Sequence, residues 1–318
     1  MRNEAVISSR IEGTHASLID VYAYEAAQFS FFERTDDVRE VYNYVRAMDY
    51  GLERLNTLPI SLRLIRELHE KLMEGVRGEA LTPGKFRRSQ NWIGPVGSTL
   101  STAPYVPPPI EEMYQALDAL EKFVHADTDV PPLIRAGMIH YQFEAIHPFL
   151  DGNGRVGRLL IVLLLCEWGL LSQPLLNLSV YIEHYRQVYY NLLLGVSQQG
   201  AWEAWLRFFL RGVIEQARES IYRMERLREI RAKYQLIADK NRNSLRMAAV
   251  IDFLFSRPVL SIRQVSKSLS FPFKSAQAYL LKLVQAGVLR EITGYARNRI
   301  FQADEILRAV QGEDFHST

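Results

Sequence analysis

The sequence contains a single cysteine in 318 residues, Cys166, which excludes an intramolecular disulfide and a zinc site built from several cysteines. It also lacks a long apolar run, because the most hydrophobic stretch, Leu159–Leu165, is far shorter than the roughly 20 residues that cross a bilayer. The amino terminus has no apolar segment typical of an export signal. These absences predict a cytoplasmic protein without a membrane partner.

An excess of charge of one sign is missing as well. Lys and Arg number 38 and Asp and Glu number 36, so the formal net charge is only +2. This balance gives no global indication of a nucleic-acid partner, although it is compatible with a local basic surface. The hydrophobic content of 48% and the length predict a folded, soluble protein of two or three domains.

Helical periodicity runs through most of the chain, so the fold class is predicted to be mostly α. The predicted helices are Ser17–Phe29, Val38–Leu55, Leu62–Gly75, Ile110–Ala126, Pro132–Ala145, an apolar helix from about Arg155, Tyr181–Leu194, Trp202–Gln216 and a charged connecting helix over Ala217–Lys240. Between them, Gly78–Pro109 is rich in Gly, Pro, Ser and Thr and predicts a long loop or hairpin. Loops of this length often serve as lids or binding loops.

The pattern changes after a predicted domain boundary at residues 241–244. Helices are predicted at Leu245–Phe255, Ile262–Leu269 and Lys274–Ala286, followed by strands at Val288–Ile292 and Asn298–Phe301. This order is typical of a winged helix-turn-helix domain. Basic residues outnumber acidic ones by eleven to six from residue 241 onward, and Lys274, Arg297 and Arg299 are candidates for phosphate contacts with DNA. Winged helices also serve in protein docking and homodimer formation, so both roles stay open.

The segment HPFLDGNGRVGR carries the clearest chemical signal. Gly152 and Gly154 flank Asn153 at the predicted start of a helix, where free backbone N–H groups and the positive helix end favour an anion. Arg155 and Arg158 are three residues apart and are expected to lie on one helix face, offering two guanidinium groups to further phosphates. Together these residues predict a polyphosphate site.

Two further residues complete the set that phosphoryl-type transfer requires. Asp151 offers a hard oxygen ligand for a magnesium ion (Mg2+) that bridges phosphate oxygens. His147 is placed to take a proton from an incoming hydroxyl. Taken singly, His-Pro, Asp-Gly and Gly-x-Gly are common in ordinary loops, caps and turns. Their joint order within one short segment favours the catalytic interpretation.

The same segment resembles the motif of the Fic (filamentation induced by cyclic AMP) family, H-P-F-x-D/E-G-N-G-R-x-x-R, at every specified position. The similarity extends through the helix at 132–145 and through Gly84–Gly94, which is similar to the family's substrate flap. The resemblance implies a Fic-type helical bundle with a β-hairpin flap, followed by a winged helix-turn-helix domain. The domains implied are amino-terminal helices (1–60), a Fic catalytic core (61–215), a linker helix (216–243) and the winged-helix domain (244–318).

The resemblance further implies a protein adenylyltransferase, which moves AMP from Mg-ATP to a Tyr, Thr or Ser hydroxyl of a protein substrate and releases pyrophosphate. His147 would be the base and Asp151 the magnesium ligand. The segment Gly152–Gly154 would hold the α- and β-phosphates, Arg155 the β-phosphate and Arg158 the γ-phosphate. Tyr189 and Tyr190 are similar to a tyrosine pair near the family's adenine pocket, although paired tyrosines on a helix are also common in cores.

The stretch SSRIEG, Ser8 to Gly13, is similar to the inhibitory motif S/T-x-x-x-E-G/N of family members with an inhibitory helix. The resemblance implies that Glu12 pairs with Arg158 where a γ-phosphate would bind, so that the chain is autoinhibited. From the residues alone, Ser8 or Thr14 would be a helix cap and Glu12 a glutamate of a first turn.

The predicted flap contains Trp92, Ile93 and Gly94, and its main-chain edge is a candidate for pairing with a target peptide. An alternative for Trp92 is a core anchor. The family's kinase-like branch departs from the motif at Gly154 and Arg158, so AMP transfer is favoured over transfer of a terminal phosphate. Use of UTP and removal of AMP remain open. The non-enzymatic alternative is a winged-helix DNA-binding transcriptional regulator with a ligand-sensing Fic-like domain.

Overall fold

The computed structural model describes residues 1–27, 36–76, 81–95, 97–240, 244–294 and 298–312. Arg297, residues 241–243 of the boundary predicted at 241–244, and the ends of two predicted segments lie outside these residues. The chain divides into two compact units, Met1–His15 with Arg39–Ala217 and Ala16–Val38 with Arg218–Thr318. Within the described ranges, the helices that are long enough to cross a bilayer are too polar for it.

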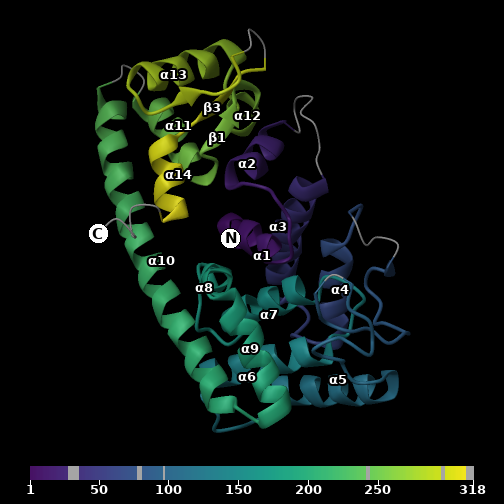
Figure 1. Cartoon of the computed structure of the whole chain (residues 1–318). Helices are drawn as coiled ribbons and strands as arrows, with labels where there is room; N and C mark the ends of the chain where they lie inside the picture. The colour runs from purple at the N-terminus through teal and green to yellow at the C-terminus, as the bar shows by residue number, and fades with distance from the viewer. Residues whose placement is uncertain (28–35, 77–80, 96, 241–243, 295–297, 313–318) are drawn as a thin grey trace. The chain divides into compact units, whose positions relative to one another are not determined.

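The first unit is mostly helical, as predicted for this part of the chain. Its helices are α1 (Arg2–Ile11), α3 (Asp36–Arg54), α4 (Leu62–Leu72), α5 (Ile110–Val124), α6 (Pro132–Ile146), α7 (Asn153–Glu167), α8 (Leu178–His184) and α9 (Arg186–Gln199) (Figure 1). The α7 helix packs against α1, α4 and α6, while α1 also packs against α8. Amino-terminal residues therefore lie against the helix that follows the motif.

The α7 helix is the centre of this bundle. Its residues Leu159–Leu165 are all buried, as expected of a helix that is apolar on every side. Trp205 closes another side of the core, where its indole Nε1 donates a hydrogen bond to the Gly137 carbonyl at 3.0 Å. The buried start of α7 is thus fixed by packing from several helices.

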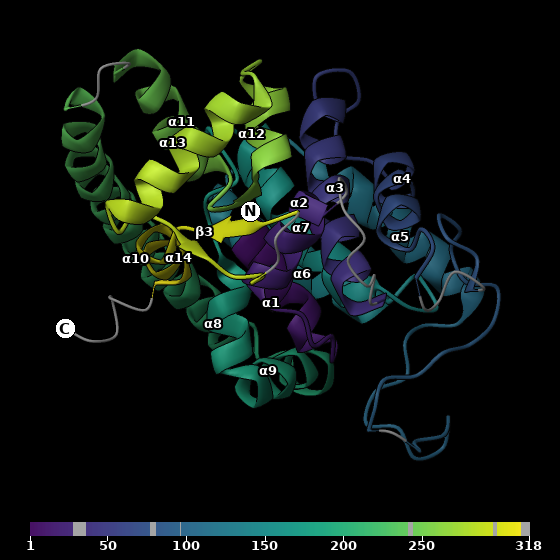
Figure 2. The same cartoon turned by 90° about the horizontal axis from the view of Figure 1, so that it is seen from above.

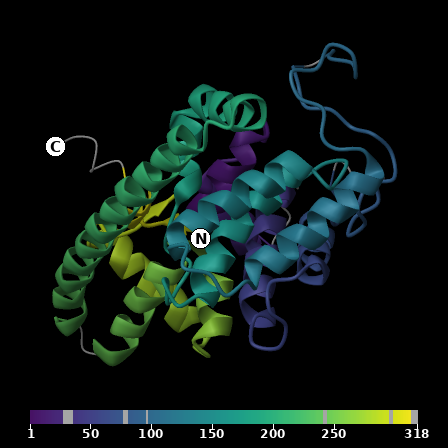
Figure 3. The ribbon, with the colours of Figure 1, turned by 90° about the horizontal axis from the view of Figure 1, so that it is seen from below.

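The α10 helix (Trp202–Asp239) runs without interruption, as Figure 3 shows. The sequence pattern predicts two segments that meet at residues 216 and 217. The chain there reads Gln216, Ala217 and Arg218, without a Gly or Pro to end a helix. The change from an apolar to a charged pattern therefore marks a change of surroundings along one helix.

The second unit combines helices with a small sheet. It contains α2 (Leu18–Ala27), α11 (Ser244–Ser256), β1 (Val259–Ser261), α12 (Ile262–Ser268), α13 (Phe273–Gln285), β2 (Arg290–Glu291), β3 (Ile300–Gln302) and α14 (Asp304–Gln311). The antiparallel strand order is β1-β3-β2, and Phe301 faces both Leu260 and Glu291. Helices α11, α12 and α13 precede β2 and β3 in the predicted order, β1 adds a strand where only a helix entry is predicted, and the winged-helix assignment itself stays a prediction.

The α2 helix packs within this second unit, which the sequence pattern does not predict. The Glu25 carbonyl accepts a hydrogen bond from the Gln264 side chain at 3.0 Å, and the Glu25 carboxylate pairs with Arg257 at 3.2 Å. Of the candidate DNA contacts, Lys274 is exposed on α13, whereas Arg299 lies 3.6 Å from the carboxylate of Glu291.

Candidate active site

The motif forms a tight turn between α6 and α7. His147 ends α6 with left-handed backbone angles, φ 47° and ψ 60°, and Gly152 precedes α7 with φ 78°. Glycine accepts such a φ freely, but histidine does so at a cost, and such strained residues gather at functional sites. The turn therefore presents the His147 imidazole beside the amino-terminal end of α7.

Asn153 closes this turn with its side chain. Its Oδ1 accepts a hydrogen bond from the Phe149 N–H, and its Nδ2 donates to the Phe149 carbonyl, both at 2.8 Å. The Asn153 amide thus shapes the loop, and only its backbone is left for an anion. Asp151 Oδ1 accepts from the Gly152 N–H at 2.6 Å, while the Asp151 side chain keeps 41% of its surface exposed.

His69 of α4 supports the turn, and the sequence gives no sign of this role. The Gly84 N–H donates to Nδ1 of His69 at 2.9 Å, so Nε2 carries the proton and donates to the Asp151 carbonyl at 3.0 Å. The ring stacks on Phe149 with centroids 3.8 Å apart. Burial lowers the pKa of His69 to about 4, which keeps this imidazole neutral.

Arg87 and Asn91 connect the turn with the loop between α4 and α5, which Figure 2 shows as an extended excursion. The buried Arg87 donates through Nε to the His147 carbonyl at 3.1 Å and through its other nitrogens to carbonyls of Ser89 and Pro108. Asn91 Nδ2 donates to the carbonyls of His147 and Phe149, at 3.3 and 3.0 Å. These contacts fix the backbone on which His147 stands.

The His147 imidazole is half-buried and borders a pocket. Its Nδ1 lies 3.3 Å from the Glu144 carbonyl, an acceptor, so the proton of the neutral ring belongs on Nδ1. Burial lowers the pKa of His147 to about 4. At neutral pH the ring is therefore uncharged, with Nε2 able to accept a proton.

Arg158 is buried and is held from α1. Its Nε donates to Ser8 Oγ at 2.9 Å, and its Nη2 donates to the Ser8 carbonyl at 2.8 Å and to Glu12 Oε1 at 2.7 Å. Burial opposes the charge on Glu12, but pairing with Arg158 outweighs it and lowers the pKa of Glu12. The predicted contact between Glu12 and Arg158 is present in the structure.

The alternative of ordinary capping is wrong for these residues. Ser8 lies inside α1, and Glu12 follows the last turn of that helix. Thr14 donates its hydroxyl to Glu40 Oε2 at 2.7 Å. Gly13 takes φ 91°, a left-handed value that suits glycine as the chain leaves α1.

Arg155 is the one motif residue whose side chain departs from the expected arrangement. Its guanidinium is buried, lies 3.3 Å from Glu40 Oε2 and contacts the sulfur of Met73 at 3.6 Å. It does not border the pocket that Arg158 borders. Residues three apart on an α-helix point about 60° from each other. The Arg155 side chain therefore leaves α7 in a different direction from Arg158 and reaches the buried Glu40 carboxylate instead of the pocket.

We expect Glu40→Ala to lower the free energy of unfolding by about 3–5 kcal/mol, because it removes the nearer and buried of the two carboxylates beside Arg155 and leaves only Asp151 Oδ1, at 3.8 Å. Urea unfolding followed by circular dichroism measures this loss. Glu74→Ala is the matched control, since Glu74 pairs with Arg46 at 2.9 Å on the surface, and it should cost under about 1 kcal/mol. Equal losses in the two variants would contradict a structural role for the Glu40 pair.

The pocket beside the motif has a volume of about 540 Å³. Its walls come from α6, α7, α9, the flap and the residue after α1. The sequence-predicted residues that border it are Glu12, Ile93, Gly94, His147, Gly154, Arg158, Tyr189 and Tyr190. Asp151, Gly152 and Asn153 lie in the adjoining turn. One cavity thus brings together residues that lie far apart in the sequence, from Glu12 to Tyr190.

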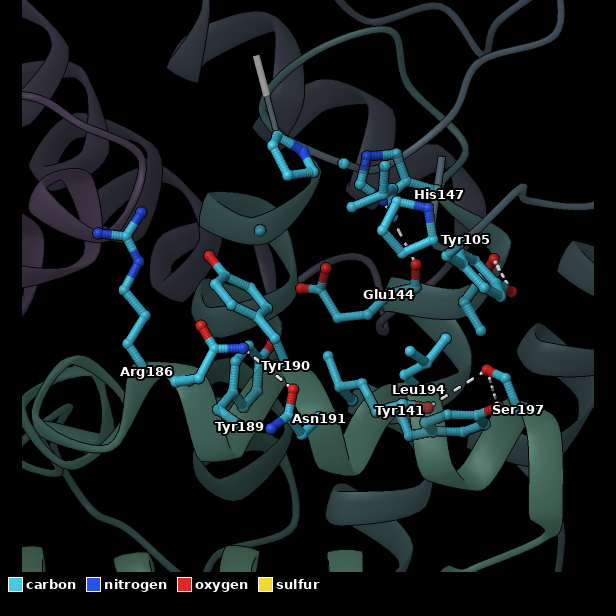
Figure 4. Close-up of a pocket in the computed structure, with 18 of the residues that line it drawn as sticks. Tyr105, Tyr141, Glu144, His147, Arg186, Tyr189, Tyr190, Asn191, Leu194 and Ser197 are labelled. Carbon is cyan, nitrogen blue, oxygen red and sulfur yellow. Dashed lines mark hydrogen bonds between the residues drawn. The ribbon is translucent and has the colours of Figure 1, made fainter. Parts of the chain in front are cut away.

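The two tyrosines of α9 differ in their surroundings. Tyr189 is only 1% exposed, and its hydroxyl lies 3.0 Å from Nε2 of the buried His140. Tyr190 is 38% exposed, and Figure 4 shows its ring on the pocket side of α9. Tyr189 is mainly a core residue, whereas Tyr190 offers an accessible aromatic face.

The flap makes one antiparallel bridge, between Ile93 and Tyr105. The Ile93 N–H donates to the Tyr105 carbonyl at 2.9 Å, and the Tyr105 hydroxyl donates to the Ala145 carbonyl of α6 at 2.9 Å. Trp92 is 44% exposed and donates through Nε1 to the Ser98 carbonyl, so the core-anchor alternative is wrong. The hairpin is thereby tied to the pocket wall.

Comparisons with known proteins agree with this geometry. A model described as Fic/DOC family matches residues 59–165, and one described as Fic/DOC family N-terminal matches residues 1–53. A protein named protein adenylyltransferase Fic from Drosophila erecta is 29% identical over 135 residues, which are 40% of this chain and 25% of that protein. Its namesake from Drosophila grimshawi is 30% identical over 135 residues, 40% of this chain and 26% of that protein. The chain thus spans about a quarter of the length of these curated relatives.

Solved structures show the same fold. A Fic family protein from Desulfovibrio desulfuricans G20 aligns with a TM-score of 0.59 at 20% identity, covering 95% of this chain and 86% of that chain. A fragment of Fic-1 from C. elegans aligns with a TM-score of 0.53 at 23% identity, covering 69% of this chain and 61% of that chain. The two family matches together cover half of the chain. The matched part includes the motif residues His147, Gly154 and Arg158, which border the pocket. This chain belongs to the Fic/DOC family.

Proposed function

We propose that the chain is a protein adenylyltransferase that moves AMP from ATP to a hydroxyl of a protein substrate. The observation that carries the proposal is the pairing of Glu12 with Arg158 beside the neutral His147, at the amino-terminal end of α7. A carboxylate held by an arginine there occupies a place suited to a phosphate. The names of the Drosophila relatives support the same activity.

The residues of the turn fit a magnesium ion bound together with nucleotide phosphates. Asp151 presents a partly exposed carboxylate, and its Oδ1 is oriented by the Gly152 N–H. Magnesium is commonly held by one or two carboxylates together with substrate phosphates, and when bound it neutralises phosphate charge. Asp151 would be its protein ligand.

The chain's own residues account for the rest of the chemistry. The backbone N–H groups of Asn153 and Gly154 and the Arg158 guanidinium would bind the phosphates, so that the α-phosphorus faces His147, while the Gly152 N–H holds the Asp151 carboxylate. The substrate oxygen bonds to that phosphorus as the bond to pyrophosphate breaks, and the hydroxyl proton passes to Nε2 of His147. The Glu144 carbonyl, 3.3 Å from Nδ1, orients the imidazole for this transfer.

The flap would hold the protein substrate. Ile93 and Gly94 border the pocket, and the bridge to Tyr105 keeps this strand segment extended. A target peptide that pairs along this edge would place its hydroxyl near His147. The accessible ring of Tyr190 would contact the nucleotide base.

The same geometry supports autoinhibition. Glu12 Oε1 lies only 2.2 Å from where a Cβ on Gly154 would stand, so its carboxylate covers the start of α7. A γ-phosphate that binds Arg158 must displace it. The inhibited arrangement is further held by Ser8, which accepts from Arg158 through both its hydroxyl and its carbonyl.

The activity of Glu12→Gly should stay nearly constant from pH 8 down to pH 5. Burial lowers the pKa of His147 to about 4, so the neutral base persists until the pH falls toward that value. A histidine at its ordinary pKa of about 6.5 would instead lose about thirtyfold in neutral form at pH 5. Initial rates with saturating Mg-ATP, with circular dichroism to confirm folding, measure this profile. A midpoint near pH 6.5 would contradict the buried, neutral base.

ATP labelled on either the α- or the γ-phosphate tests the proposal. With Glu12→Gly added to a cell lysate, the α-label on protein should exceed that in the same lysate with His147→Ala in the Glu12→Gly background, the γ-label should not, and mass spectrometry should find an adenosine monophosphate adduct. Transfer of the γ-label would indicate a kinase, and label from UTP another nucleotidyl donor. Salt-sensitive retention on DNA without any transfer would favour the regulator instead.

A further inference from the structure

Glu144 is a buried carboxylate for which the steps above give no role to the side chain. It lies on α6, one turn before His147, and is 9% exposed. Within the described residues its Oε1 has no hydrogen-bond partner, although the side chain borders the pocket. Figure 4 shows the carboxyl group pointing into the cavity between Tyr190 and His147. Burying a carboxyl oxygen without a partner is costly, so a partner is expected in another state of the site.

Two glycines of α7 show where this carboxylate sits. A Cβ on Gly157 would lie 2.3 Å from Oε1 of Glu144, just as a Cβ on Gly154 would lie 2.2 Å from Oε1 of Glu12 and 2.9 Å from Nη1 of Arg158. Residues 154 and 157 are neighbours along one side of the helix. The carboxylates of Glu12 and Glu144 therefore lie about one turn apart on the same side of α7 as Arg158.

In the part of the chain that the structure describes, Glu144 faces the charges of two residues, one on α7 and one directly after α1. From α7 it faces Arg158, and from the end of α1 it faces Glu12. On α6 itself, burial lowers the pKa of His140 to about 3 and that of His147 to about 4, so both rings are neutral. The α9 helix contributes Tyr189 and Tyr190, whose hydroxyl pKa values are raised by burial.

These surroundings hold Glu144 close to the point of ionisation at neutral pH. Burial raises the pKa of Glu144 to about 7, and the nearby charge of Glu12 adds to this rise, while Arg158 opposes it. The carboxyl group is thus protonated at pH 6 and largely ionised at pH 8. Its charge changes within a range in which Glu12 stays ionised.

We propose that Glu144 acts on Arg158 indirectly, by weakening its contact with Glu12: the free carboxyl oxygen of Glu144 lies about one turn along α7 from that of Glu12 and repels it as a nucleotide enters. The inference rests on the proposed function, because a bound γ-phosphate is what displaces Glu12. Protonated Glu144 leaves the pair of Glu12 and Arg158 undisturbed. Ionised Glu144 repels Glu12 and attracts Arg158, so it favours the state that accepts a nucleotide.

Titration calorimetry with Mg-ATP at pH 6 and pH 8 tests this role in four proteins: wild type, Glu144→Gln, Glu12→Gly and the double variant. In the wild-type background Glu144→Gln should weaken binding about tenfold at pH 8, as for a pKa change of about one unit, and less than about twofold at pH 6. In the Glu12→Gly background it should have little effect at either pH, because nothing has to be displaced.

The Glu12→Gly protein at the two pH values corrects for the titration of the nucleotide itself. Tight binding by the double variant would show that the glutamine is tolerated and the pocket intact. An equal loss in both backgrounds would make Glu144 an ordinary pocket contact, and no loss at pH 8 would leave it without a role in displacement. Either result overturns the inference.

Unfolding without nucleotide gives an independent test. Because folding raises the pKa of Glu144, the folded state loses stability as pH rises from about 4.5 through about 7. The unfolding constant of the wild type should rise relative to Glu144→Gln over this range by about tenfold for each unit of pKa shift. The rise should be smaller when Glu12 is replaced by Gly. The exposed Glu74→Gln should follow the wild type.

Identical pH dependence with and without Glu12 would refute the coupling between the two carboxylates. If Glu12→Gly binds no nucleotide, the proposed function fails, whereas the unfolding series still decides whether Glu12 and Glu144 are coupled. The two failures are therefore distinguishable.

Discussion

Replacing Glu12 by Gly is expected to raise the rate of AMP transfer by about 10–100-fold. The charge-assisted contact between Arg158 and Glu12, 2.7 Å long and formed by a buried guanidinium and a partly exposed carboxylate, has to be broken before a phosphate can take its place. Such contacts are worth about 1.5–3 kcal/mol, and each 1.4 kcal/mol corresponds to a tenfold change in population. Initial rates of label transfer from α-labelled ATP, at one protein and nucleotide concentration, measure the effect.

Arg10→Gly is the matched control, because it places the same flexible residue in the last turn of α1 at an exposed position that does not border the pocket. It should leave the rate near that of the wild type. Equal rates for Glu12→Gly and the wild type would count against autoinhibition by Glu12. A gain in both variants would indicate that loosening of α1, rather than loss of the carboxylate, relieves the enzyme.

Removing the imidazole in the activated background, as His147→Ala with Glu12→Gly, should lower the transfer rate about 10²–10⁴-fold. General-base catalysis contributes effects of this size. Binding of Mg-ATP should remain within a fewfold, because the phosphates would be held by α7 backbone N–H groups and Arg158. Rate and nucleotide affinity, measured on the same preparations, separate loss of the base from loss of the pocket.

His125→Ala serves as the control histidine, since His125 is exposed at the end of α5 and contacts the Ile60 carbonyl outside the pocket. Made in the same Glu12→Gly background, His125→Ala should transfer label at the rate of Glu12→Gly alone. If His147→Ala keeps the full rate, the base must be another group. If it also abolishes nucleotide binding, the imidazole serves the pocket rather than the proton transfer.

The local sequence predicted the turn, because the residues that form it limit the backbone directly. A glycine pair at a helix start and a histidine before proline restrict the backbone to few conformations. The contact from Glu12 to Arg158 joins residues 146 apart, and only the family resemblance suggested it.

The supports of the turn could not be predicted in this way. Arg87, Asn91 and His69 act by hydrogen bonds to backbone carbonyls, which any sequence provides, so no residue pattern indicates their partners. Arg155 is a related case. Its spacing from Arg158 predicted that both guanidinium groups bind phosphate, whereas Arg155 pairs with Glu40 of the α3 helix. Long-range pairing of buried charges depends on the packing of whole helices.

The division of the chain also escaped the sequence pattern. The α2 helix shows helical periodicity like α3, and nothing in this periodicity distinguishes packing with α1 and α3 from packing with β1. The α10 helix changes from apolar to charged residues without a break, because a helix that passes from one unit to the other needs no turn.

The most direct test of the account is a crystal structure of Glu12→Gly with magnesium and a non-hydrolysable ATP analogue. We expect a terminal phosphate oxygen on Arg158, where Glu12 Oε1 now lies 2.7 Å from Nη2, and the α-phosphorus facing Nε2 of His147. A nucleotide bound elsewhere, or phosphates that leave Arg158 and the start of α7 uncontacted, would contradict the proposed function.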